Sequence, residues 1–115
     1  MNIEELINKH HKILGGMYLE CGPGWYDLID KLCTNIQRHI DAGNFEQIHA
    51  SQVKEKFGGL RFYIGYGDEY IMDIVEKAED MSYNTCEECG STDASQTATS
   101  GWISTLCEKC IGDKK

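Results

Sequence analysis

Two Cys-x-x-Cys pairs near the carboxyl end constrain this chain more than any other feature of its sequence. Cys86 and Cys89 form the first pair and Cys107 and Cys110 form the second, with residues 90–106 between them. A tetrahedral zinc site is built in this way, because each short pair wraps two sulfurs onto one side of the ion and the segment between the pairs reverses direction. The spacing therefore predicts one structural Zn²⁺ held by four thiolates.

Disulfide or redox use of these cysteines is the alternative. The first residues of the chain mix acidic and basic groups and contain no apolar signal segment, so we expect a cytoplasmic protein. Disulfides are rare in that compartment. A redox Cys-x-x-Cys also needs a helix N-terminus in a βαβ setting, which the pattern does not predict. Zinc is therefore favoured.

The rest of the chain predicts an α+β fold. Apolar residues recur every three or four positions in three segments, which indicates helices over about 3–14, 25–41 and 69–81. A β-hairpin is expected over 46–66. We predict that the three helices pack on an antiparallel sheet centred on this hairpin, and that residues 1–81 form the α+β core.

The hairpin prediction rests on the sequence Phe57-Gly58-Gly59-Leu60. Two glycines suit a two-residue type I′ turn. This register pairs Phe57 with Leu60 and Lys56 with Arg61. One face then carries Val53, Phe57, Leu60, Phe62 and Ile64, which we expect to face the core, and the other carries Lys54, Lys56, Arg61 and Tyr63.

Residues 82–115 are predicted to form a zinc ribbon packed on the core. Positions 91–100 are polar and typical of a loop, and 101–106 indicate a strand that leads into the second cysteine pair. Few residues follow Cys110, so we expect no helix there, which favours a ribbon over a treble clef. Trp102 is expected to pack over the ribbon.

The net charge of the chain limits the class of partner that it can bind. The formal net charge is −8, and four thiolates with one Zn²⁺ would make it more negative. So acidic a protein repels a phosphate backbone unless its cations gather on one face. The outer face of the hairpin is the candidate for such a face. The predicted contact surface consists of Trp25, Tyr26, Lys54, Lys56, Gly58, Gly59, Arg61 and Tyr63.

Two interpretations of this surface stay open. Lys56 opposite Arg61 is a like-charge pair that an anionic partner would stabilise. Carboxylates of the chain's own helices could neutralise the same cations instead, and the candidates are Asp27, Asp30, Asp73 and Glu76.

Catalytic patterns are missing from the sequence. It contains no P-loop, no G-x-S-x-G and no zincin motif. Cys33 lies on the apolar stripe of the second helix and is expected to pack in the core. Cys21 lies in a Gly-Pro turn with no activating histidine close in sequence. We therefore predict no enzymatic activity and no catalytic residue.

Three stretches carry a family resemblance: Cys-Gly-Pro-Gly-Trp-Tyr-Asp-Leu-Ile, Val-Lys-Glu-Lys-Phe-Gly-Gly-Leu-Arg-Phe-Tyr, and the cysteine segment with its central tryptophan. Together they resemble a group of small bacteriophage and prophage proteins. The resemblance implies an accessory protein that acts in the cytoplasm of an infected bacterium and binds host machinery. The expected function is non-enzymatic binding of a host protein, with modulation or inhibition of host or defence factors. The alternative is binding of a nucleic acid or nucleotide by the same surface.

Overall fold

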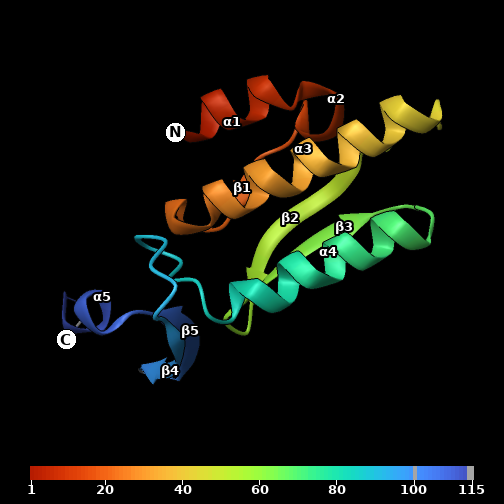
Figure 1. Ribbon diagram of the computed structural model, residues 1–115. Helices are drawn as coiled ribbons and strands as arrows, with labels where there is room; N and C mark the ends of the chain where they lie inside the picture. Colours follow the sequence, from red (N-terminus) through yellow and green to blue (C-terminus); the bar gives the residue numbers. More distant parts are fainter. Residues whose placement is uncertain (100, 114–115) are drawn as a thin grey trace.

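Residues 1–99 and 101–113 are described by the computed structural model. They form a mixed α+β fold with three main helices, a three-stranded sheet and a C-terminal hairpin that bears the cysteines. The cysteine hairpin lies at one end of a molecule that measures 49 × 27 × 21 Å (Figure 1).

The N-terminal helix is divided in two. Asn2 caps α1 (Ile3–Lys9) as a capping box requires, and α2 spans His11–Leu14. The division falls at His10, whose imidazole donates a hydrogen bond to Asp30 of the next long helix (2.7 Å). This bond holds the pKa of Asp30 below its usual value. The periodicity of the apolar residues did not reveal this break, which coincides with the His10–Asp30 contact between helices.

The longest helix, α3 (Tyr26–Gly43), confirms the predicted second helix and follows a short 3₁₀ turn over Pro23–Trp25. It ends at Asn44, which adopts the left-handed conformation. The predicted apolar stripe is buried, including Cys33, as expected. Its members are Leu28, Ile29, Leu32, Cys33, Ile36 and Ile40.

The predicted hairpin is formed by β2 (Ala50–Lys56) and β3 (Gly59–Ile64), but its register differs. Phe57 and Gly58 make the turn, with φ of 54° and 84°, and both angles are positive as a type I′ turn requires. Lys56 therefore pairs with Gly59, and the cation opposite Arg61 is Lys54. The prediction took the two glycines as the turn, whereas Gly59 begins the second strand.

The register decides which side chains face the core. Val53, Leu60 and Phe62 are buried, as predicted. Phe57, expected on the same face, is instead 66% exposed because it occupies the turn.

A third strand makes the sheet mixed. The two residues of β1 (Leu19–Glu20) pair in parallel with β2, so the strand order is β1-β2-β3. The expectation of a purely antiparallel sheet is therefore wrong. Two residues are too few to show the alternation by which a strand is recognised in sequence.

The third main helix, α4 (Glu69–Ser82), begins at the predicted cap Asp68 and runs beside β3 and α3 (Figure 1). Two of its side chains accept hydrogen bonds from the backbone of β3, which is an edge strand of the sheet. The backbone N–H of Leu60 donates to Ser82 Oγ (2.8 Å), and that of Phe62 donates to Glu79 Oε2 (2.9 Å). This covering of the edge blocks further strands from pairing there.

The C-terminal part contains β4 (Ser95–Thr99), β5 (Trp102–Leu106) and α5 (Glu108–Asp113). The strand expected over 101–106 is confirmed as β5. The expected loop over 91–100 is wrong in part, because β4 pairs antiparallel with β5, while residue 100 lies outside the described residues. Its polar sequence gave no strand signal.

One apolar cluster joins α1, α2, α3, α4 and the sheet, and a small second cluster surrounds the cysteines. None of the helices in the described part of the chain is both long enough and apolar enough to span a membrane.

The edge contact of Ser82 gives a prediction. Ser82→Ala should lower the free energy of unfolding by about 1–3 kcal/mol, because the buried N–H of Leu60 loses its acceptor. Urea unfolding would measure the change. Ser51→Ala on the same sheet is the control, since Ser51 is exposed and bonds the Tyr63 carbonyl at 3.3 Å. Equal losses in both variants would contradict the interpretation.

Candidate metal centre and contact surface

The first cysteine pair lies in a tight turn after α4. The N–H of Gly90 donates to the Cys86 carbonyl and the N–H of Cys86 donates to the Ser91 carbonyl, both at 2.8 Å. Gly90 has a φ of 84°, which a side chain would disfavour. The turn is joined to β5 by a bond from Glu87 N–H to the Thr105 carbonyl (3.0 Å).

The second pair spans the end of β5 and the start of a helix. Cys107 follows the strand and Cys110 lies in α5, where the N–H of Ile111 donates to the Cys107 carbonyl. The expectation that no helix could follow is wrong, because α5 begins within the pair itself. The resulting order of turn, hairpin and helix is that of a treble clef, which the sequence interpretation had set aside.

The four sulfurs gather at one point, all within 4.8 Å of one another. Cys89 Sγ and Cys107 Sγ lie 3.6 Å apart, far beyond the roughly 2.05 Å of a disulfide. Four sulfurs bound at about 2.3 Å to a tetrahedral zinc ion are separated by about 3.8 Å, so the observed spacing fits. The cluster can hold one metal ion.

The protonation pattern of the cluster also suits a cation. Burial raises the pKa of Cys86, but N–H groups of Cys107, Cys89 and Glu88 lower it to about 6. The pKa of Cys110 is raised, chiefly by its hydrogen bond with Cys107. The crowded thiols therefore share protons between them, and a divalent cation would favour their thiolate forms.

We call residues 83–99 and 101–113, which follow α4, the cysteine module. It packs on the turn that precedes α3. Gly24 N–H donates to the Glu87 carbonyl (2.7 Å), and Gly22 N–H donates to the Glu87 carboxylate (2.8 Å). A Cβ on Gly24 would lie 2.1 Å from the Cys86 carbonyl oxygen. The sequence marked this segment only as a turn. The two glycines that flank Pro23 were the available signal of a close backbone approach.

Trp25 is the first correction to the predicted contact surface. Its side chain is fully buried, and its indole N–H donates to the Thr85 carbonyl (2.8 Å). It therefore joins the core to the cysteine module and offers nothing to a partner. Tyr26 is half-buried against the core. Trp102 shows the opposite error, because it was expected to pack over the ribbon and is 76% exposed.

The two glycines of the predicted surface are covered by the chain itself. A Cβ on Gly58 would meet Gln96 and Ile103, and one on Gly59 would meet the ring of Tyr83 at about 2.5 Å. The close approach that was expected from a partner is thus made by the cysteine hairpin and Tyr83.

Three residues of the predicted surface, Lys54, Arg61 and Tyr63, lie on one face of the sheet. We define the outer face of the sheet by these three and by Tyr18, Glu20 and Gln52, which the sequence did not predict. Lys54 lies between Glu20 and Arg61 in the register. The Arg61 guanidinium donates to Tyr83 Oη (3.0 Å) and to the Leu60 carbonyl (3.2 Å). The exposed Lys56 has its ammonium 5.8 Å from the Phe57 ring centroid.

The carboxylates proposed to neutralise these cations lie mostly elsewhere. Asp27 pairs with Lys31 (3.1 Å) and Asp73 with Lys77 (2.9 Å), each on its own helix. Asp30 pairs with Lys9 and His10, while Glu76 lines a hollow together with Arg61.

Cys21 and His39 lie in defined surroundings. Burial, with Glu87 adding to it, raises the pKa of Cys21 to about 12, so its thiol stays protonated at neutral pH. His39 bonds Asp68 (2.6 Å) between the rings of Phe45 and Tyr70. Sequence reasoning predicted neither this contact nor that of His10.

No family model, no curated protein and no solved structure matches this chain. The resemblance to bacteriophage proteins therefore stays a prediction, and the geometry has to carry the functional argument.

The contact between Gly24 and the first cysteine pair yields a prediction. Gly24→Ala should destabilise the protein by about 1–3 kcal/mol, because the new methyl group forces apart the backbones of Gly24 and Cys86. Gly65→Ala is the matched control, since nothing lies within 4 Å of its added Cβ. Thermal unfolding of both variants measures the difference, and a tolerated Gly24→Ala would contradict the packing described.

Proposed function

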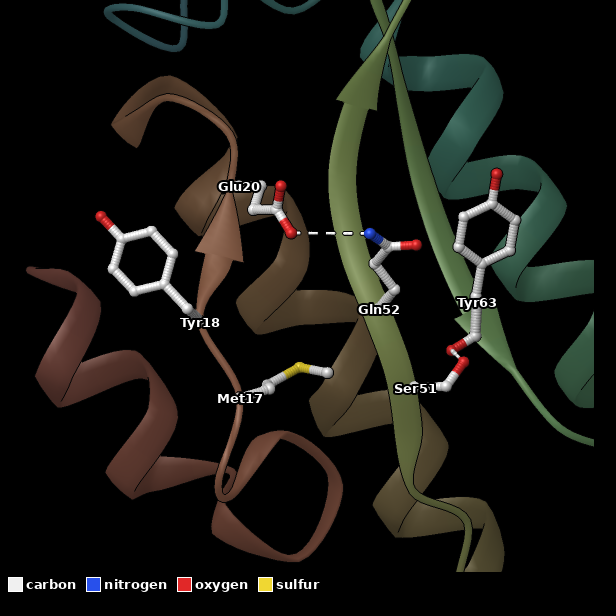
Figure 2. Close-up of a pocket in the computed structure, with 6 residues that line it drawn as sticks. All are labelled: Met17, Tyr18, Glu20, Ser51, Gln52 and Tyr63. Carbon is white, nitrogen blue, oxygen red and sulfur yellow. Dashed lines mark hydrogen bonds between the residues drawn. The ribbon is translucent and has the colours of Figure 1, made fainter.

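We propose that the protein is a non-enzymatic binding module that holds one structural Zn²⁺ and engages a protein partner through the outer face of its sheet. The outer face is the observation that carries the proposal. The helices α3 and α4 lie behind the strands, and the opposite side presents the aromatic side chains of Tyr18 and Tyr63 together with the carboxylate of Glu20 (Figure 2).

Zinc is the metal that suits the cluster best. Four cysteine sulfurs at tetrahedral spacing are a zinc donor set, and they fill all four positions of the ion. A closed site of this kind leaves no place for a reactive water, so its role is to stabilise the fold. The C-terminal part needs such support, because its apolar cluster contains only a few residues around the cysteines.

The metal assignment predicts one Zn²⁺ per chain by elemental analysis. Co²⁺ in its place should give the visible absorption of a tetrahedral thiolate site. Chelation should lower the melting temperature, because the ion binds only the folded state. Cys86→Ser should abolish the cobalt spectrum, whereas Cys21→Ser, outside the cluster, should leave it unchanged. A metal-free protein of unchanged stability would refute the assignment.

The outer face has the composition of a protein interface. Tyr18 and Tyr63 stand on either side of a hollow of about 590 Å³, and Met17, Glu20, Ser51 and Gln52 also line it (Figure 2). Tyr18 is 74% exposed and Tyr63 38%. Tyrosine, methionine and arginine are enriched at interfaces, where tyrosine combines an apolar ring with a hydrogen-bonding hydroxyl.

A protein partner fits this face better than a nucleic acid. Arg61 is already held by Tyr83 and Leu60, and Lys54 has Glu20 as its register neighbour, so few free cations remain to follow a phosphate backbone. The net charge of −8 opposes a polyanion further. If the resemblance to phage proteins holds, a protein of the infected host is the partner, and modulation of that protein is the outcome.

Photocrosslinking tests this proposal. With p-benzoylphenylalanine in place of Tyr18, crosslinks in bacterial lysate should join the protein to another protein and should survive nuclease treatment. The same probe in place of Tyr66, which is exposed but outside the outer face, should not give these products. Nuclease-sensitive products would favour the nucleic-acid alternative.

Affinity for the captured protein then provides a second measurement. Replacing both Tyr18 and Tyr63 by alanine should weaken binding by about 10-fold or more, because aromatic anchors dominate interface energy. Tyr66→Ala should leave the affinity unchanged. Binding that weakens steeply with salt, in the manner of phosphate contacts, would contradict the protein assignment.

A further inference from the structure

A hollow of about 230 Å³ at the break between α1 and α2 is lined almost entirely by basic side chains. The lining residues are Lys9, His10, His11, Lys12 and Gln37. None of them carries a carboxylate, although acidic residues outnumber lysine and arginine by 19 to 11 in the chain. The local charge of this hollow is therefore opposite to the net charge of the protein, and it attracts an anion.

The break in the helix gathers these side chains. Successive residues of a continuous α-helix point about 100° apart, so consecutive side chains would face different sides of its axis. His10 has a φ of −114° and a ψ of 39°, and it separates α1 from α2. All the side chains from Lys9 to Lys12 then line one hollow, to which α3 adds Gln37.

His10 turns one ring nitrogen toward this hollow. The residue is only 8% exposed, and its Nε2 lies 2.7 Å from the Asp30 carboxylate. Among the described residues, no buried side-chain nitrogen or oxygen is without a hydrogen-bond partner, and no hydrogen bond engages His10 Nδ1. Nδ1 therefore meets solvent, and it does so at the hollow that His10 lines. A protonated His10 donates to Asp30 from one nitrogen and to an anion from the other.

The charges at the hollow leave cations available for a ligand. Lys9 and His10 share the single carboxylate of Asp30, which lies 2.9 Å from Lys9 Nζ. Within residues 1–99 and 101–113, neither His11 nor Lys12 belongs to an ion pair. Protonation of either imidazole adds a further positive charge.

One more carboxylate lies behind the lining. Asp41 accepts a hydrogen bond from Gln37 Nε2 at 2.9 Å and does not itself line the hollow. It opposes an anion less than a carboxylate in the hollow would, because Gln37 lies between them. Protonation of His10 then tips the balance of charge further toward binding.

Size and charge specify the ligand. A volume of about 230 Å³ equals that of about eight liquid waters, which suits one compact anion rather than the backbone of a polymer. Phosphate oxygens accept strong hydrogen bonds from ammonium and imidazolium donors. We propose that this hollow binds a phosphate group, with Lys12 as its exposed cation and Nδ1 of protonated His10 as its buried donor. The site shares no residue with the outer face of the sheet and does not depend on the proposed function.

A nuclear magnetic resonance titration of the full chain tests the site. Inorganic phosphate should shift the amide signals of residues 9–12 and should saturate. Lys12→Gln should weaken binding about 3-fold or more, because an exposed ion pair is lost. Lys77→Gln is the matched control, since it removes the same charge from an exposed lysine of α4 outside the hollow. Shifts that do not saturate, or equal weakening in both variants, would overturn the proposal.

A second ligand identifies the source of the phosphate. Glycerol 1-phosphate carries the same group as an ester, so its affinity is compared with that of inorganic phosphate. Tighter binding of the ester assigns the site to a phosphorylated metabolite, and tighter binding of inorganic phosphate assigns it to the free ion. Failure of both to bind would refute the site, whatever the outer face is found to do.

Sulfate tests the part of His10, because its charge does not change between about pH 6 and pH 8, where imidazole titrates. Sulfate should bind about 3-fold or more tightly at the lower pH, since the imidazolium donates from both ring nitrogens. The difference should persist in His11→Gln, which retains His10. Equal binding at both pH values, or a difference that His11→Gln removes, would overturn the role assigned to His10.

Discussion

The backbone of Gly24 lies directly against that of Cys86 and Glu87, and the way in which the cysteine module sits on the core depends on this contact. A side chain at position 24 would collide with the Cys86 carbonyl, and the bond from Gly24 to Glu87 fixes the distance. Trp25 adds a second attachment through the Thr85 carbonyl. One end of the cysteine cluster is thereby anchored to the start of α3, so the four sulfurs are ordered together with the helical core.

A second attachment lies at the other end of the module, where Gln96 and Thr105 bond the turn between β2 and β3. The two attachments have different effects on the exposure of the side chains around them. The first is buried and serves the fold, while the second leaves Phe57, Trp102 and Ile103 exposed beside one another. The first attachment is made by residues 85–87 at the first cysteine pair, and the second is made by the hairpin between the two pairs. A metal ion held by both pairs would therefore stabilise the scaffold and the exposed surface together.

Local sequence patterns predicted those parts of the fold that depend on neighbours in the chain. The apolar stripe identified α3, Asp68 and Asn2 identified helix starts, and the cysteine spacing identified the cluster. The patterns failed where contacts with residues far away in the sequence determine the local structure. The hairpin register differs from the predicted one because Phe57 and Gly58 form the turn and Gly59 begins β3. Three residues of the predicted contact surface are covered by the chain itself, namely Trp25, Gly58 and Gly59. Two-residue β1 and polar β4 carried no periodicity to detect.

The sequence alone determined that four thiols would come together, that the second long helix would bury one face, and that the chain would be strongly acidic. Each of these properties follows from residue type and short-range spacing. Only the tertiary structure decided which aromatic side chains face outward, because burial depends on what packs against each residue. Trp25 and Trp102 show this clearly, since the same residue type is enclosed where two backbones meet and exposed where a hairpin ends.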